Sequence, residues 1–469
     1  MNETRNLVDF LTGIRFEDLP AEVVKTAKLC VLDTVGVGIF GSQKEWSKIV
    51  ADFARESGGT AECGVWCGGW KTSVQYAAMV NGTSAHGIEM DDRSATYDLH
   101  PGAAIIPAAM AVWDKTKTNG RKVIEAVTAG YEIGFRIGAA LKGSGRQRFY
   151  GSPIKNLFGA TVAAGKLLDM DNTAMLNAVG IAGSMASGLK EWSNDPLGTM
   201  VKRLSGGGWP AHNGVIAALM ALKGLTGPAT ILEGKRGVCH AFGVNEGNAS
   251  WKEPQTAELA KDLGKHFMIM HRETKAYATN GGLQAAVEAV NELKNAYKIN
   301  PEEIEHVDIG CSFKLYDTHE SKQPQSIMAA QYSLPFVTAF AFFCDLSDPA
   351  VWEDKVLTEP KVVELVNKVH IAIDDELQKI YQETNDYGGA KIAVKLKNGQ
   401  EHKTKVRYSK GTVGNPATSE DLHKKFNLLA GHILPQERVQ TIARLIDSLE
   451  ELESSVNLIG ALTQALPDR

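Results

Sequence analysis

Residues 81–107 read NGTSAHGIEMDDRSATYDLHPGAAIIP, and segments of small or apolar residues flank this stretch on both sides. Its charged and imidazole side chains include His86, Glu89, Asp91, Asp92, Arg93 and His100. Ionised groups between segments that look buried are costly unless they are paired or used in chemistry. The stretch therefore predicts two flanking helices with a reactive site between them.

Helical patterns extend outward from this stretch over most of the first half of the chain. Asp18 and Pro20 are typical of a helix start, and residues 23–40 are apolar nearly all round. The letters GVGIFG at 36–41 match a dinucleotide-binding pattern, but a helical segment precedes them where that site needs a strand. We expect these glycines to allow close helix packing. Helical spacing continues at 103–112, 123–141, 157–168, 173–187 and 213–223.

The pattern changes after about residue 267. Residues 307–313 alternate as a strand does, and 391–397 and 402–408 flank Asn398-Gly399, which is a strong hairpin signal. Helical patterns return at 419–430 and 435–452. The sequence thus predicts a mainly α chain with a smaller α+β module over residues 268–410.

Composition restricts the possible partners. The 469 residues are 43% hydrophobic and 22% charged, with a net charge of −5 that leaves no basic excess for nucleic acid. The first ten residues are unlike a signal peptide, and no apolar run reaches the ~20 residues of a membrane span. We expect a cytoplasmic protein without membrane contact, whose cysteines are free thiols.

His100 and the acidic cluster are the first candidates for catalysis. Adjacent carboxylates cannot both be buried and unpaired, so either neighbouring cations neutralise them or one stays protonated as a general acid. A helix end with solvated acids is the alternative. His100 precedes an apolar helix whose dipole disfavours its cationic form, which suits a base or donor, although a packing histidine has the same pattern.

Cations elsewhere suggest an anionic ligand. Lys202 and Arg203 precede the glycines 206–208, which favours an anion site at a Gly-rich turn or, alternatively, an ordinary basic loop. Tyr150 and Lys155 combine a phenol and a cation at a helix entry. Residues 271–277, with Arg272 and Lys275, lie at the inferred domain boundary, where ligand sites are common. We find no metal-binding motif and expect no metal.

Several motifs together resemble the MmgE/PrpD family over most of the chain. The residues that carry the resemblance are 32–37, Asn81-Gly82 with His86, Asp91-Asp92, His100-Pro101-Gly102 and Pro107, then 130–136, 200–204 with Asn213-Gly214, 331–335 and 424–426. The chain departs from the family pattern by lacking imidazoles at Tyr150, Ser205 and Gly281, and by having Glu89 in place of an aspartate.

The resemblance implies a large all-helical domain built from both chain ends (1–267 and 411–469) and a smaller α+β lid (268–410). It also implies a homodimer that needs no metal or other cofactor. Carried over residue by residue, the resemblance places the acidic cluster, His100 and Lys202 in the site. Together with the residue chemistry above, we expect the catalytic residues to be His100, Lys202, Tyr150 and Asp91. The substrate-binding residues we expect are Glu89, Asp92, Arg93, Lys155, Arg203, Arg272, Lys275 and Tyr332.

The resulting functional hypothesis is a cofactor-independent lyase. It would dehydrate or decarboxylate a small polycarboxylate by proton transfer at the carbon next to a carboxylate. The missing imidazoles leave two alternatives: an epimerase or isomerase of a dicarboxylate, or a non-catalytic member with a degenerate site.

Overall fold

The computed structural model describes residues 2–142, 149–193, 199–243, 252–384 and 386–466. It separates into two compact units. The first unit comprises Met1–Glu191, Met200–Arg272 and Ser419–Arg469, and the second comprises Trp192–Thr199 and Glu273–Thr418. The division into a helical domain (1–267 and 411–469) and an α+β lid (268–410) remains a prediction.

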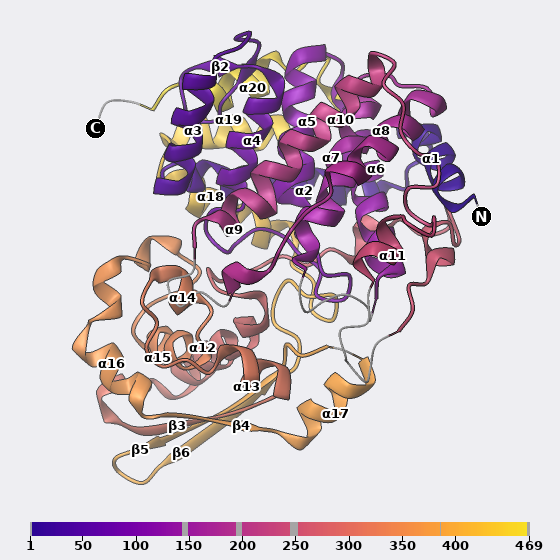
Figure 1. Cartoon of the computed structure of the whole chain (residues 1–469). Helices are drawn as coiled ribbons and strands as arrows, with labels where there is room; N and C mark the ends of the chain where they lie inside the picture. The colour runs from indigo at the N-terminus through magenta and orange to yellow at the C-terminus, as the bar shows by residue number, and fades with distance from the viewer. Residues whose placement is uncertain (1, 143–148, 194–198, 244–251, 385, 467–469) are drawn as a thin grey trace. The chain divides into compact units, whose positions relative to one another are not determined.

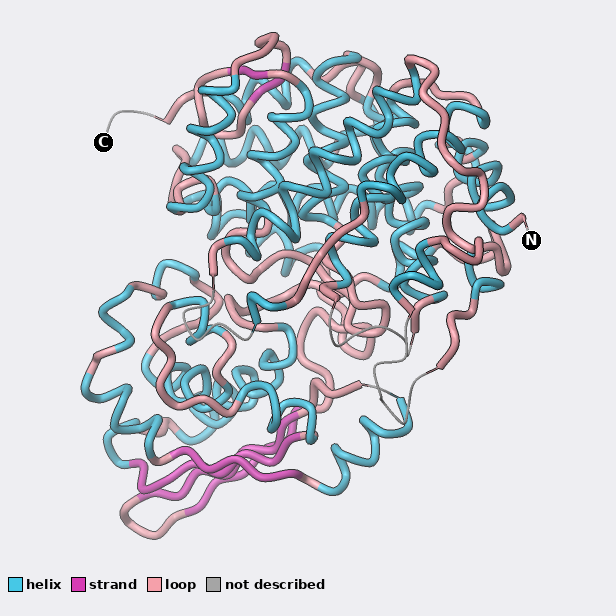
Figure 2. The backbone as a smooth tube through the Cα atoms, viewed as in Figure 1, coloured by secondary structure: helices cyan, strands magenta, loops and turns pink. Residues whose placement is uncertain are grey.

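The first unit is built of helices from both ends of the chain (Figures 1 and 2). They are α1 (Glu3–Gly13), α2 (Ala21–Gly41), α3 (Glu45–Ser57), α4 (Val74–Ala85), α5 (Gly102–Thr116), α6 (Gly120–Ala140), α7 (Gly151–Leu167), α8 (Asn172–Met185), α9 (Val201–Arg203), α10 (Trp209–Leu222), α11 (Val238–Phe242), α18 (Ser419–Gly431), α19 (Gln436–Asp447) and α20 (Val456–Thr463). A short hairpin pairs β1 (Cys63–Gly64) with β2 (Lys71–Thr72). Helix α18 packs against α2, so the C-terminal segment of the chain completes the core around an N-terminal helix.

The prediction of a mainly α chain is confirmed, and small residues explain how the helices pack. Helix α5 contacts α4, α6 and α7 and is buried from Gly102 to Asp114. The GVGIFG letters lie inside α2, where Gly36 faces Phe426 and Gly38 faces Trp66. Their predicted role in close helix packing is therefore confirmed.

The second unit combines helices with one four-stranded sheet in the order β4-β3-β5-β6 (Figure 2). Its helices are α12 (Gln284–Tyr297), α13 (Phe313–His319), α14 (Ile327–Gln331), α15 (Leu334–Phe343), α16 (Pro360–Asn367) and α17 (Asp375–Thr384). Its strands are β3 (Ile304–Cys311), β4 (Val369–Ile373), β5 (Ala390–Leu396) and β6 (Glu401–Val406). Strand β3 runs parallel to β4 and antiparallel to β5. Helix α12 packs against β5, β6 and α15.

Two strand predictions can be compared with this sheet. The hairpin around Asn398-Gly399 is confirmed, and Gly399 supplies the positive φ of 88° that the turn needs. The strand predicted at 307–313 is displaced, because it begins at Ile304 and ends at Cys311. Ser312, a residue type favoured at helix starts, is followed directly by α13. Within the described residues, no helix is both long and apolar enough to cross a membrane.

A glycine pair at the crossing of α6 and α7 gives a stability prediction. A Cβ at Gly159 would lie 2.8 Å from the carbonyl oxygen of Gly130 and would press on Ile105. We expect Gly159→Ala to lower the free energy of unfolding by about 1–3 kcal/mol, because main chain has no room to move there. Chemical denaturation measures the loss.

Gly460→Ala is the matched control, since Gly460 lies on α20 and an added methyl group would meet nothing within 4 Å. That variant should be neutral or more stable by about 0.5–1 kcal/mol, because alanine favours a helix. Equal destabilisation by both variants would contradict the packing argument.

Candidate active site

The candidate site lies within the first unit and centres on the carboxylate of Asp91. Its Oδ2 is 2.8 Å from Nδ1 of His86 and 2.8 Å from Nδ1 of His100. His86 follows the last residue of α4, and His100 stands two residues before α5, so the turn between these helices brings the three together. One oxygen can serve both rings only if each Nδ1 donates a proton, and this fixes the tautomer of each ring.

Tyr150 extends this chain on the far side of His86. The Tyr150 hydroxyl is 3.0 Å from Nε2 of His86, where it donates because Nδ1 carries the ring's hydrogen. Burial lowers the pKa of His86 to about 4 against the opposing effect of Asp91, and burial raises the pKa of the Tyr150 phenol well above 10. Near neutral pH, His86 is therefore neutral and Tyr150 keeps its proton.

The two histidines differ in access to solvent. The side chain of His86 is fully buried, whereas 19% of the His100 side chain is exposed. Their rings meet edge to face, with centroids 5.2 Å apart. His100 is therefore the more accessible imidazole of the pair.

A second cluster joins Glu89 to Lys202 and Arg203. Oε1 of Glu89 accepts hydrogen bonds from both cations, and the three side chains are about 1% exposed. Arg203 also donates to the carbonyl oxygen of His86 at 3.3 Å, which connects the two clusters. Glu89 has a φ of 57°, a left-handed conformation that is unusual outside glycine and that often marks functional sites.

The glycines after Arg203 form neither the turn nor the loop expected from the sequence. Leu204–Gly208 is a π-helical turn that runs on into α10. Such turns are rare and frequent at functional sites. A Cβ at Gly206 would overlap Nε2 of His86 and lie 3.0 Å from the Tyr150 hydroxyl. The glycine therefore lets the π-turn touch the imidazole, and tertiary packing overrides the local turn signal.

Asp92 differs from Asp91 although the two are adjacent. Its Oδ1 accepts from the backbone N–H of Gly102 at 2.8 Å, and its Oδ2 accepts from the Tyr131 hydroxyl at 2.6 Å. Burial raises the pKa of Asp92 to about 7. The carboxyl group thus anchors the first residue of α5, directly after the His100-Pro101 pair.

The other predicted binding residues have varied surroundings. The Arg93 residue is 9% exposed. Arg272 ends the middle segment of the first unit, whereas Lys275 and Tyr332 belong to the second unit. The Tyr332 carbonyl accepts from Nδ1 of His319 at 2.8 Å. Of the predicted set, the structure brings together Asp91, His100 and Tyr150, and separately Glu89, Lys202 and Arg203.

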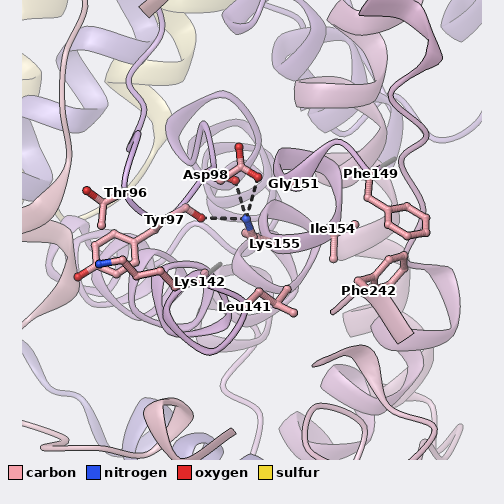
Figure 3. A pocket seen from close by; sticks show the side chains of 11 residues that line it. Thr96, Tyr97, Asp98, Leu141, Lys142, Phe149, Gly151, Ile154, Lys155 and Phe242 are labelled. Atoms are coloured by element: carbon pink, nitrogen blue, oxygen red, sulfur yellow. Dashed lines mark hydrogen bonds and ion pairs between the residues drawn. The ribbon is translucent and has the colours of Figure 1, made fainter. Parts of the chain in front are cut away.

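Lys155 lies beside a small pocket that borders the segment leading to His100 (Figure 3). Its Nζ donates to the carbonyl oxygens of Tyr97 and Asp98 at 2.8 and 2.7 Å, and Oδ2 of Asp98 is 3.3 Å away. Phe149 and Phe242 form another part of the wall. The ammonium group thus faces the protein's own oxygens.

Two residues at the centre of the site, His86 and Asn156, had no catalytic or binding role predicted from the sequence, and Gly206 was predicted only as part of a Gly-rich turn. Asn156 donates to the carbonyl oxygen of His100 at 2.7 Å. The spacing of His86, five residues before Asp91 across a helix end, was the available signal for the first. Asn156 and Gly206 reach the site only through long-range packing.

The two imidazoles and Asp91 also form a possible set of metal ligands. One potential ligand atom from each of His86, Asp91 and His100 lies within 4.8 Å of the others. Two neutral imidazoles and a carboxylate suit Zn²⁺. The two N–H···O bonds to Asp91 account for the same geometry, so a bound ion would have to displace those protons.

The raised pKa of Asp92 predicts how stability depends on pH. A carboxyl group with a pKa of 3.8 when unfolded and about 7 when folded stabilises the fold below pH 4. That contribution is lost as the pH rises towards 7. From pH 4 to pH 7, we expect the free energy of unfolding of the wild type to fall by a few kcal/mol more than that of Asp92→Asn. The reason is that one pKa unit corresponds to about 1.4 kcal/mol.

Denaturant titrations of both proteins from pH 4 to pH 8 measure this difference. Asp354→Asn, at an exposed aspartate, is the control and should follow the wild-type curve. A constant difference between wild type and Asp92→Asn would show that Asp92 ionises normally in the fold.

Comparison with known proteins places these residues in a family. The model of the MmgE/PrpD N-terminal domain matches residues 5–249, and that of the C-terminal domain matches residues 277–451. A cis-aconitate decarboxylase of Aspergillus terreus is 27% identical, with 98% of this chain and 95% of the relative aligned. The cis-aconitate decarboxylase of Homo sapiens is 26% identical over 96% of this chain and 92% of its own. Because the two domain models span most of its length, this chain belongs to the MmgE/PrpD family.

Proposed function

We propose that this chain is a lyase that removes CO₂, or alternatively water, from a small polycarboxylate. Family membership and the names of its relatives support an enzyme of this kind, and an unsaturated tricarboxylate such as cis-aconitate is the first substrate to test. The observation that carries the proposal is the pair of imidazoles on Asp91, because it prepares a histidine for proton transfer.

His100 is the proposed proton-transfer group. Its Nδ1–H is held by Asp91, and we assign to Nε2 the exchange of a proton with substrate carbon. In a decarboxylation, the bond from carbon to the departing carboxylate breaks and its electron pair stays on the carbon skeleton. CO₂ leaves, a proton from Nε2 of protonated His100 completes the product, and the imidazole regains a proton from solvent.

Lys202 and Arg203 are the proposed stabilisers of the developing negative charge. Buried cations lower the energy of a carbanion delocalised into a carboxylate far more than exposed ones do. Both donate to Glu89, so a substrate carboxylate would compete with Glu89 for them. This competition is the proposed role of Glu89 at the binding step.

Tyr150 occupies a position where the family commonly has an imidazole, and we propose that it takes part in proton handling through His86. Its hydroxyl donates to Nε2 of His86 and keeps its proton near neutral pH. Because Tyr150 acts through His86, its loss should cost less activity than loss of His100. We propose that Arg93 and Arg272 bind the more distant carboxylates.

Substitution of the central groups tests the proposal. His100→Asn should lower kcat by about 100-fold or more, because a positioned general acid or base contributes that much. Lys202→Ala should abolish measurable turnover, and Tyr150→Phe should have a smaller effect. The assay is NMR of purified protein with citrate-like acids in deuterated water, which detects proton exchange, CO₂ and products together.

The matched controls are His240→Asn and Lys223→Ala, which change exposed residues of the same types. Both should retain wild-type rates. Absence of exchange, product and CO₂ with every acid would refute the enzyme proposal for those substrates. Exchange without CO₂ or water loss would identify an epimerase or isomerase instead, and an active Lys202→Ala variant would remove Lys202 from the mechanism.

Metal ions provide an independent prediction. Incubation with a chelator should leave turnover unchanged, since the proposed steps use only side chains. Added Zn²⁺ should inhibit reversibly by displacing the Nδ1 hydrogens that His86 and His100 donate to Asp91. Activity that falls on chelation and returns with a metal would show that the imidazoles are ligands rather than proton carriers.

A further inference from the structure

The segment that ends at His100 is bonded to helix α7 through its main-chain oxygens. Lys155 donates to the carbonyl groups of Tyr97 and Asp98 (Figure 3). The next residue, Asn156, donates from Nδ2 to the carbonyl of His100 at 2.7 Å. Lys155 and Asn156, consecutive residues of α7, therefore bind three of the carbonyl groups of residues 97–100.

This segment has a conformation that needs such support. Asp98 has a φ of 56°, in the left-handed region that is unfavourable for a residue with a side chain. A Cβ at Gly151, the first residue of α7, would overlap both the main-chain oxygen and Oδ2 of Asp98. The segment thus lies directly on the start of α7, where the Lys155 ammonium reaches its carbonyls.

The amide of Asn156 also has a definite orientation. Its two described partners are the carbonyl oxygens of His100 and Gly206, the latter at 3.2 Å, so the NH₂ group must face them. Oδ1 is buried and has no hydrogen-bond partner among the described residues. An unsatisfied buried oxygen is unfavourable, so the two donated bonds are the reason for an asparagine here.

These bonds connect opposite sides of the site. Gly206 packs against His86 and Tyr150, while His100 contacts Asp91. Asn156 joins the main chain of Gly206 to that of His100. His100 is consequently held at two points: its ring by Asp91 and its carbonyl by Asn156.

We propose that Lys155 and Asn156 are positioning residues that clamp the main chain at 97–100 and thereby keep the His100 ring on Asp91. In this role Lys155 binds the protein's own carbonyl groups. The sequence had instead predicted that it binds a carboxylate of the substrate. The kinetic part of the test rests on the proposed lyase activity.

Kinetics separate positioning from substrate binding. Lys155→Met removes the ammonium and keeps most of the stem, and we expect kcat to fall about tenfold or more with KM changed by less than about threefold. Asn156→Asp, which has the same shape but lacks both donors, should act in the same way. A tenfold rise in KM at unchanged kcat would assign Lys155 to the substrate and overturn the clamp.

The chain offers a matched control for each variant. Lys142→Met changes an exposed lysine that lines the same pocket. Thr161→Val changes a buried polar residue of α7 whose hydroxyl bonds within the helix, to Leu157. Both controls should keep wild-type kcat and KM, and a tenfold loss of kcat in either would show that the effects are not specific to the clamp.

A second readout does not depend on activity. In protein labelled with ¹⁵N-histidine, the Nδ1–H groups of His86 and His100 should give NMR signals protected by Asp91. Lys155→Met and Asn156→Asp should shift or broaden the His100 signal and leave that of His86 in place. If either variant fails to fold, Asn156→Ser, which retains one hydroxyl donor, should give an intermediate change.

An unchanged His100 signal in folded variants would overturn the proposal. If wild-type protein turns over none of the acids, the lyase proposal fails, and the NMR experiment still decides whether Lys155 and Asn156 position His100.

Discussion

A single carboxylate oxygen that accepts hydrogen bonds from two imidazoles is the interaction on which the site depends. Oδ2 of Asp91 fixes the hydrogens of His86 and His100 on Nδ1, so that each Nε2 lacks a hydrogen in the neutral ring. One of these accepts from Tyr150, in the interior, and the other belongs to the partly exposed ring. The same oxygen therefore holds a buried histidine on one side and, on the other, the partly exposed histidine that we propose transfers protons.

Close packing of small residues makes this interaction possible. His86 can meet Tyr150 only because residue 206 has no side chain, and the segment before His100 can lie on α7 only because residue 151 has none. The long buried helices α5, α6 and α7 pack through glycine and alanine for the same reason. The high glycine content of the chain thus serves the site as well as the core.

Local patterns predicted the helices and the hairpin, because side-chain periodicity and turn chemistry act over a few residues. They also predicted His100 and Asp91, which lie within one short stretch. Gly206 was assigned to a turn, since glycine clusters favour turns locally, whereas packing against α4 makes the segment helical. Asn156 had no local signal, because its partners are 56 and 50 positions away in the chain.

The adjacent acids show why residue type alone left two alternatives open. Paired and protonated carboxylates were both consistent with the sequence, and the fold uses one acid in each manner. Asp91 faces two N–H groups from imidazoles, whereas Asp92 faces a phenol and a backbone N–H in a buried place that raises its pKa to about 7. Because successive side chains of a turn point in different directions, two neighbours acquire different environments. Through its bond to the N–H of Gly102, Asp92 anchors the start of α5 two residues after His100, whose ring is held by Asp91.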